Sequence, residues 1–200
     1  GLPFTDVLSA GSDLVVTTWD ILSGDVKPGA HVLVYDDAGD NAGMQAAELI
    51  ANSGAKVEIM TPDRSFAPEV MAMNLTPYMR AMQEKGVTFT VTWRLKSAHR
   101  DGNRLRAVIG TDYSDFTREQ MVDQIVVNHG TRPLDDLYFD LRPHSLNLGA
   151  VNHEDLVAQR PQTDILNPDG MFRLWRIGDA VASRNTHAAI LDALRLMAVH

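Results

Sequence analysis

The feature that most constrains this chain is a strand–loop–helix–strand pattern in its first third. The short β-branched run 31–35 is bounded by turn residues and predicts a buried strand. Apolar positions over 42–53 form a helical stripe that ends at Gly54, and a second strand is expected over 56–60. A unit of about 30 residues is the size of a right-handed βαβ crossover, so the two strands should be parallel.

The middle of the sequence extends this unit into a larger sheet. Thr76-Pro77 indicates the start of a helical region. Residues 87–95 alternate like a strand, Asp101-Gly102-Asn103 predicts a hairpin turn, and 105–109 should return antiparallel. A further buried strand is expected over 124–127. We therefore predict an α/β fold: a Rossmann-like parallel sheet flanked by helices, with an antiparallel β-meander excursion, plus part of a second nucleotide-binding domain.

The last third of the chain has a different character. Residues 134–169 are rich in Pro, Asn, Asp and His, which is typical of a connector with at most short helices. A strand is expected over Phe172 to Ile177, followed by the turn Gly178-Asp179-Ala180 and a final helix of about 15 residues.

Composition excludes several classes of function. The chain has no cysteine, which removes disulfides, thiolate nucleophiles and cysteine-ligated metal or iron–sulfur sites. The 18 basic and 26 acidic residues give a net charge of −8, the wrong sign for binding nucleic acid or anionic membranes. No apolar run approaches the ~20 residues that span a bilayer, and no signal peptide is evident, so a cytoplasmic location is expected. The 7 histidines form no HExxH motif and no G-x-S-x-G elbow occurs, so neither metal ligands nor catalytic residues are predicted.

The first candidate site is the loop after the first strand, where a dinucleotide-binding fold carries its glycine-rich turn. Gly39 matches the second glycine of G-x-G-x-x-G/A and Ala42 the small third position, whereas Asp37 replaces the first glycine. The motif works because backbone N–H groups at a helix N-terminus hold a pyrophosphate. Here Asp36, Asp37 and Asp40 surround that spot, and each carboxylate would cost about 3–4 kcal/mol against a phosphate charge. The loop therefore either holds a dinucleotide or only maintains the fold, and the charges favour the second interpretation.

The second candidate site is the Gly178-Asp179-Ala180 turn, which lies between the expected strand and the final helix. An aspartate at such a junction can accept hydrogen bonds from a ribityl or ribose hydroxyl, while the helix N-terminus faces a phosphate. The alternative is a plain turn in which glycine supplies the bend and aspartate caps the helix, and spacing alone rates the two equally. The candidate cofactor-binding residues are Gly178, Asp179, Ala180, Arg184, Gly39 and Ala42.

Four segments, taken in order, resemble one family of proteins. They are Val16 to Gly24, Asp36 to Gly54, Gly130-Thr131-Arg132-Pro133, and Ile177 to Ala180 with Arg184. In their order and spacing they resemble the C-terminal nucleotide-binding region of the multidomain flavoproteins related to old yellow enzyme and NADH:flavin oxidoreductases. This family includes trimethylamine dehydrogenase, dienoyl-CoA reductase and the N-methylproline and dimethylglycine demethylating enzymes. The resemblance spans nearly all 200 residues.

The resemblance implies a division into nested domains. Residues 1–17 would be the remnant of a flavin- or ADP-binding domain, 18–134 an inserted NAD(P)-type Rossmann domain, 135–170 a connector and 171–200 a return to the first domain. The implied cofactor is FAD or ADP, with NAD(P)H left open. FMN and an iron–sulfur cluster are expected only in an N-terminal barrel that these residues do not contain. The start at Gly1, without methionine, fits either a removed tag or a piece of a longer protein.

The resemblance also implies a function with two alternatives. In the first, the parent protein is a demethylating dehydrogenase for an N-methylated amine or amino acid, and this chain is its nucleotide-binding and packing module, inactive alone. In the second, the chain is a vestigial nucleotide fold that binds ADP or nothing and serves assembly or electron-partner docking. The expected partners are the barrel of the same polypeptide and a small-molecule nucleotide. A homo-oligomer is compatible with both.

Overall fold

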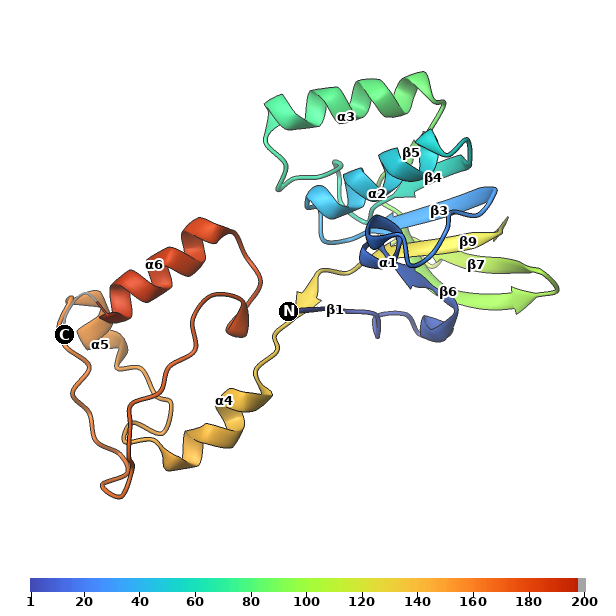
Figure 1. Cartoon of the computed structure of the whole chain (residues 1–200). Coiled ribbons are helices and arrows are strands. Elements are labelled where there is room, and N and C mark those ends of the chain that lie inside the picture. Colours follow the sequence, from blue (N-terminus) through green and yellow to red (C-terminus); the bar gives the residue numbers. More distant parts are fainter. Residues whose placement is uncertain (198–200) are drawn as a thin grey trace. The chain divides into compact units, whose positions relative to one another are not determined.

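The computed structural model describes residues 1–197, and these divide into two compact units (Figure 1). Residues 3–130 form one unit, which we call the sheet unit. Residues 1–2 and the residues from 131 onward form the other, which we call the C-terminal unit. Two short strands at the limits of these units, β1 (Leu2–Pro3) and β10 (Thr131–Arg132), pair as a two-stranded sheet.

The sheet unit is built on a parallel sheet of five strands. Its central strand, β3, lies between β9 and β4, and Leu33 aligns with Ile125 on one side and Glu58 on the other. The predicted βαβ unit is therefore confirmed. In spatial order the strands are β2 (Val16–Thr17), β9 (Gln124–Asn128), β3 (His31–Asp36), β4 (Lys56–Met60) and β5 (Thr88–Thr90).

Alternate residues of the buried strands face opposite sides of this sheet. On β3, Val32 and Val34 join a core cluster shared with the helices, whereas Leu33 and Tyr35 join a cluster shared with the antiparallel strands. A strand covered on both faces reads as a continuous apolar run, which is why 31–35 was recognisable. The covering helices are α1 (Thr18–Ser23), α2 (Asn41–Asn52) and α3 (Ala72–Glu84).

The opposite face is covered by an antiparallel meander of three strands, so that this unit has three layers (Figure 1). The hairpin predicted at Gly102 joins the first two strands, and the predicted α/β class with a meander is confirmed. Glu58 of β4 accepts a hydrogen bond from Gln120 Nε2 at 2.7 Å and thereby ties the meander to the parallel sheet. The strands are β6 (Arg94–Asp101), β7 (Arg104–Gly110) and β8 (Thr117–Val122).

Two local predictions in this unit were wrong. Pro77 does not begin a helix, because α3 starts five residues earlier at Ala72 and contains the proline. Packing of Leu75 and Met79 against the helical core outweighs the backbone hydrogen bond that proline cannot make. The expected strand over 87–95 is divided between β5 and β6, because Thr92 has a left-handed φ of 64° that carries the chain from one sheet to the other.

The C-terminal unit consists of short helices joined by irregular chain. The short helices expected in 134–169 are present, whereas the prediction of a strand over 172–177 was wrong. Only Phe172 of that segment pairs, through a single bridge to Ser145, and an extended segment without a partner strand does not form a sheet. The elements are α4 (Asp136–Leu141), a 3₁₀ turn at Arg142–His144, α5 (His153–Val157), a 3₁₀ turn at Gly178–Ala180 and α6 (Thr186–Met197).

Contacts between elements set the limits of the two units. Residues 3–17 group with the sheet unit, because β2 pairs with β9 and Ala10 bridges to Ser97 of the meander. Residues 135–170 group with the residues after 171. The nested-domain boundaries that the resemblance implies stay a prediction. A further 3₁₀ turn lies at Ser12–Leu14.

Apolar burial is concentrated in the sheet unit. Among the described residues of the C-terminal unit, Leu196 is the one buried hydrophobic side chain. Ile190, Leu191 and Leu194 of α6 are exposed, and so is Leu137 of α4. A unit of this size with so little buried apolar surface has a small free energy of unfolding, because burial must offset the conformational entropy lost on folding.

We therefore expect matched isoleucine truncations in the two units to differ sharply. Ile109→Ala in β7 removes a fully buried side chain and should lower the free energy of unfolding by about 2–5 kcal/mol. Ile190→Ala on α6 removes an exposed side chain and should change the free energy of unfolding by less than about 0.5 kcal/mol. Urea denaturation measures both, and equal losses would contradict the unequal burial of the two units.

Candidate functional site

The first candidate site lies where strands β3 and β9 end. The chain continues from β3 to β4 and β5 on one side, while β9 lies on the other side, so strand order reverses between β3 and β9. In open α/β sheets this reversal creates the crevice in which nucleotides bind, at the carboxyl ends of the strands. Asp36 ends β3 and Asn128 ends β9, and the two residues align in the sheet. Both are buried.

The backbone amides of the loop are bonded to carboxylates of the same chain. Gly39 N and Ala38 N donate to Asp36 Oδ1 at 2.9 and 3.2 Å. Ala42 N, in the first turn of α2, donates to Oδ1 of the N-cap residue Asp40 at 2.8 Å. These are the N–H groups that would hold a pyrophosphate in a dinucleotide-binding fold. Gly39 and Ala42, predicted as cofactor contacts, therefore have internal acceptors.

One side-chain amide holds the two carboxylates together. Asn128 Nδ2 donates to Asp36 Oδ1 at 2.8 Å and to Asp40 Oδ1 at 2.9 Å. Its own oxygen accepts a 3.4 Å hydrogen bond from Thr18 Oγ1, which lies at the start of α1. We call Asp36, Asp40 and Asn128 the carboxylate clamp. The acidic residues of this loop were predicted from the sequence, whereas Asn128 was missed; its position at the end of a buried strand was the available signal.

Asp36 is the most deeply buried member of the clamp. Only 1% of the residue is exposed, and burial raises the pKa of its carboxyl to about 6. The hydrogen bond from Gly39 N and that from Asn128 oppose this shift, because they stabilise the ionised form. Oδ2 has no hydrogen-bond partner in the described structure and faces Gly43 of α2, where a Cβ atom would lie 2.4 Å from it.

A second polar pair flanks the loop. His129 Nδ1 lies 2.9 Å from Asp37 Oδ1, and the imidazole packs edge-on against the Tyr35 ring. Burial and the Asp37 charge raise the pKa of the Tyr35 hydroxyl. Arg94 forms an ion pair with Asp112 at 2.8 Å and donates to the Tyr35 hydroxyl at 3.5 Å. These pairs leave His129 and Arg94 engaged within the protein.

The second candidate site is the turn at Gly178–Ala180. It precedes α6, but the strand expected before it is not formed. Gly178 has a left-handed φ of 56° and lies against Ala189, where a Cβ atom would approach to 3.1 Å. The Asp179 side chain is exposed. At the start of α6, Asn185 Oδ1 accepts a hydrogen bond from Ala188 N at 2.9 Å.

Asp192, which sequence analysis missed, brings two of the predicted residues together. Its Oδ2 accepts a hydrogen bond from Gly178 N at 3.0 Å and also pairs with Arg184. These interactions, with Arg184 the larger, lower the pKa of the Asp192 carboxyl. The signal in the sequence was a single acidic residue within the amphipathic final helix. Within the described residues, the hydrogen bonds of Asp192 go to Gly178 and Arg184 and not to Asp179 or Ala180.

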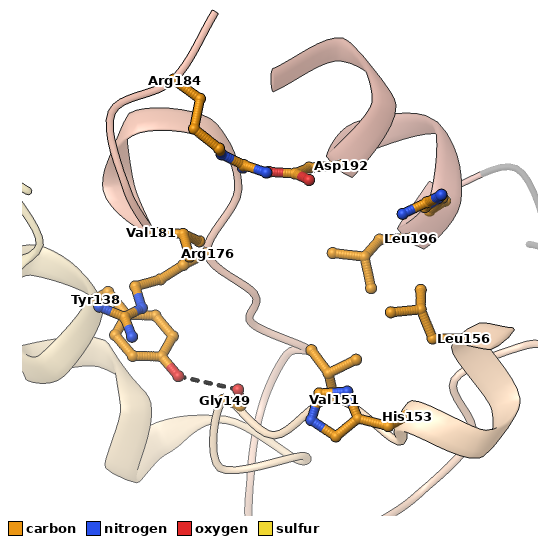
Figure 2. A pocket seen from close by; sticks show the side chains of 11 residues that line it. Tyr138, Gly149, Val151, His153, Leu156, Arg176, Val181, Arg184, Asp192 and Leu196 are labelled. Atoms are coloured by element: carbon orange, nitrogen blue, oxygen red, sulfur yellow. Dashed lines mark hydrogen bonds and ion pairs between the residues drawn. The ribbon is translucent and has the colours of Figure 1, made fainter. Parts of the chain in front are cut away.

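A cavity of about 410 Å³ opens beside this turn (Figure 2). Leu156 and Leu196 supply its apolar wall, and Figure 2 shows the two side chains facing each other. Arg176 lies 4.7 Å above the centre of the Tyr138 ring and pairs with Asp135. Arginines that are paired with carboxylates and aliphatic side chains thus share one hollow, a lining suited to a group with both polar and apolar parts.

Metal sites and membrane-spanning helices are both absent from residues 1–197. No group of three or more His, Asp or Glu side chains in this range could hold a metal ion. No helix in the same range is long and apolar enough to cross a membrane.

Curated proteins resemble the chain over almost its entire length. The probable N-methylproline demethylase of Rhizobium meliloti is 61% identical over 98% of this chain, and the N,N-dimethylglycine/sarcosine dehydrogenase of Chromohalobacter salexigens is 43% identical over 92%. The multifunctional alkene reductase/demethylase OYE of Caballeronia cordobensis is 31% identical over 98%. The chain spans only 27–29% of the length of these relatives. No family model matches it.

Solved structures share the fold at lower identity. Histamine dehydrogenase from Rhizobium sp. 4-9 superposes with a TM-score of 0.70 at 19% identity, over 98% of this chain and 28% of that protein. A 2-naphthoyl-CoA reductase gives a TM-score of 0.67 at 22% identity, over 100% of this chain and 25% of that protein.

The raised pKa of Asp36 predicts a pH dependence of stability. The pKa of about 6 in the folded protein lies above the ordinary aspartate pKa of 3.8, so the folded protein binds more protons than the unfolded chain between these pH values. The contribution of Asp36 to the free energy of unfolding should fall by up to about 3 kcal/mol as the pH rises from about 4 to 6. Asp36→Asn removes this titration. The free energy of unfolding of the variant minus that of the wild type, measured by urea denaturation, should therefore increase across that pH range. Parallel pH curves would contradict the prediction.

The contact between Gly43 and Asp36 predicts that replacing this helical glycine by alanine destabilises the protein. Replacing glycine by alanine inside a helix ordinarily stabilises a protein by up to about 1 kcal/mol. Here Gly43→Ala places a methyl group against Asp36 Oδ2 and should instead lower the free energy of unfolding by about 1–3 kcal/mol. In an Asp36→Ala background the loss should largely disappear, since the clashing oxygen is gone. A full loss in both backgrounds, measured by chemical denaturation, would refute the contact.

Proposed function

The chain belongs to the flavoprotein oxidoreductase family that includes N-methylproline demethylase and dimethylglycine/sarcosine dehydrogenase, and we propose that it is the nucleotide-fold part of such an enzyme. The observation that carries the proposal is the similarity to these proteins along almost the whole chain. The parent enzyme would oxidise an N-methylated amine or amino acid and release the demethylated product. Flavin, when bound to the parent, supplies the two-electron acceptor of that oxidation.

The residues of this chain would serve binding and assembly in that enzyme rather than the chemical step. Asp179 fits a nucleotide contact, because its exposed carboxylate can accept hydrogen bonds from ribose or ribityl hydroxyls. Gly178 lets the backbone approach closely at the same turn, since it has no side chain. Arg184 is already paired with Asp192 and would position the turn instead of meeting a phosphate directly.

The sparse burial in the C-terminal unit supports an assembly role. The exposed leucines of α6 and the apolar wall beside Leu156 would be covered by the remainder of a longer polypeptide. Covering such a surface contributes roughly 25 cal/mol per Å² of apolar area. The chain would thereby act as the packing partner of the barrel that the family resemblance implies.

The second candidate function is a vestigial nucleotide fold that binds ADP or nothing. The specific observation in its favour is the bonding of loop amides to Asp36 and Asp40, which leaves the glycine loop satisfied without a ligand. This function concerns the sheet unit, so it is compatible with a nucleotide at Gly178–Ala180.

The test compares the isolated chain with the longer protein that its gene encodes. We expect residues 1–200 alone to be colourless and inactive, and the longer protein to be yellow and to release formaldehyde from N-methylproline or N,N-dimethylglycine. In the longer protein, Asp179→Ala should weaken ADP or flavin binding by about tenfold, as for the loss of one well-placed hydrogen-bond acceptor. Asp169→Ala, an exposed carboxylate in the same unit, is the matched control and should leave binding unchanged. A longer protein without flavin, or without activity on N-methylated amino acids, would contradict the proposal.

A further inference from the structure

We propose that the carboxylates of Asp36 and Asp40 take the place of dinucleotide phosphates and thereby close the glycine loop of the sheet unit to NAD(P)H. This inference deepens the second candidate function, and it is independent of the proposed demethylation because it rests only on contacts within the sheet unit. It makes the carboxylate clamp a determinant of specificity: the unit retains the dinucleotide-binding fold and rejects the ligand.

The hydrogen bonds of the clamp are those that a diphosphate would make. A pyrophosphate at such a loop accepts hydrogen bonds from N–H groups of the turn and of the first helical turn. In this protein, Gly39 N donates to Asp36 at 2.9 Å and Ala42 N donates to Asp40 at 2.8 Å. Oxygens with negative charge therefore already occupy both positions, one at the turn and one at the helix N-terminus.

The clamp is held by the fold and not only by the loop itself. Asn128 belongs to β9, 92 positions from Asp36 in the sequence, and bridges both carboxylates. Thr18 fixes the Asn128 side chain from α1, and Gly43 packs against Asp36 from α2. Three elements of the sheet unit thus converge on the carboxylate clamp, which includes Asn128, so that releasing the amides requires several buried contacts to break together.

Electrostatic repulsion and lack of space also disfavour a diphosphate at this loop. A diphosphate would bring about two negative charges beside Asp36, Asp37 and Asp40, and each close pair is repelled by roughly 3–4 kcal/mol at an effective dielectric near 20. Arg94, a cationic side chain beside the loop, does not offset this repulsion, because it is paired with Asp112. The turn at Gly39 also lies directly against Pro68, where even a methyl group would approach to 2.6 Å.

The experiment is a titration of the 200-residue chain with NADH, followed by fluorescence and calorimetry. The wild-type chain should show no saturable binding up to millimolar NADH. The variant Asp36→Ala/Asp40→Gly frees the amides and keeps an acceptable N-cap, because glycine is tolerated at that position. It should bind NADH at least about tenfold more tightly than the wild type. Asp36→Asn is the matched control: its amide oxygen still occupies Gly39 N without the charge, so it should remain unable to bind.

Two results would overturn the inference. One is micromolar binding of NADH by the wild-type chain, with the amide NMR signals of Gly39 and Ala42 shifting during the titration. The other is an Asp36→Ala/Asp40→Gly variant that folds, as judged by circular dichroism and a cooperative thermal transition, yet gains no affinity. If that variant does not fold, Asp40→Gly alone decides the matter. It should acquire an Ala42 amide signal that responds to pyrophosphate, and the absence of that response would contradict the inference.

Discussion

The backbone N–H groups that follow the end of β3 need hydrogen-bond acceptors, and the surrounding structure of the sheet unit supplies them. Where β3 turns into α2, the backbone N–H groups of the loop and of the first helical turn have no partners in regular secondary structure. Dinucleotide-binding proteins leave them for a ligand. In this chain Asp36 and Asp40 supply the acceptors, and Asn128 holds the two side chains in place. The neighbouring elements can then pack closely without a bound molecule.

The parallel core was predictable because its signals are local. The strand 31–35, the helix after it and the strand 56–60 each carry their pattern within a dozen residues, and the structure has all three. The meander and its turn at Gly102 were equally visible. Errors arose where tertiary contacts decide the local structure. Pro77 remains helical because its neighbours pack in the core, and a left-handed Thr92 ends one strand and begins another.

The candidate sites were less predictable because their decisive partners are distant in sequence. Counting charges near Gly39 indicated repulsion of a phosphate, but it did not reveal that the carboxylates are hydrogen-bonded to the loop itself. That required Asn128, which only the sheet register brings opposite Asp36. Likewise Gly178 and Arg184, which were predicted as cofactor contacts, are joined by Asp192, and this residue lies inside a helix with ordinary composition. The expected strand before Gly178 was wrong because strand formation depends on a partner strand that a local pattern does not specify.

The position of Asn128 in the chain has a consequence for how the protein reaches its final structure. The unit β3–α2–β4 consists of contacts between residues close in sequence, which form early, whereas β9 must close a loop of roughly ninety residues to reach β3. During synthesis the glycine loop therefore emerges long before the side chain that restrains it. Until β9 has docked, Asp36 and Asp40 can accept from the loop amides, but Asn128 does not yet hold the two carboxylates in place. The carboxylate clamp is therefore complete only when the sheet is complete.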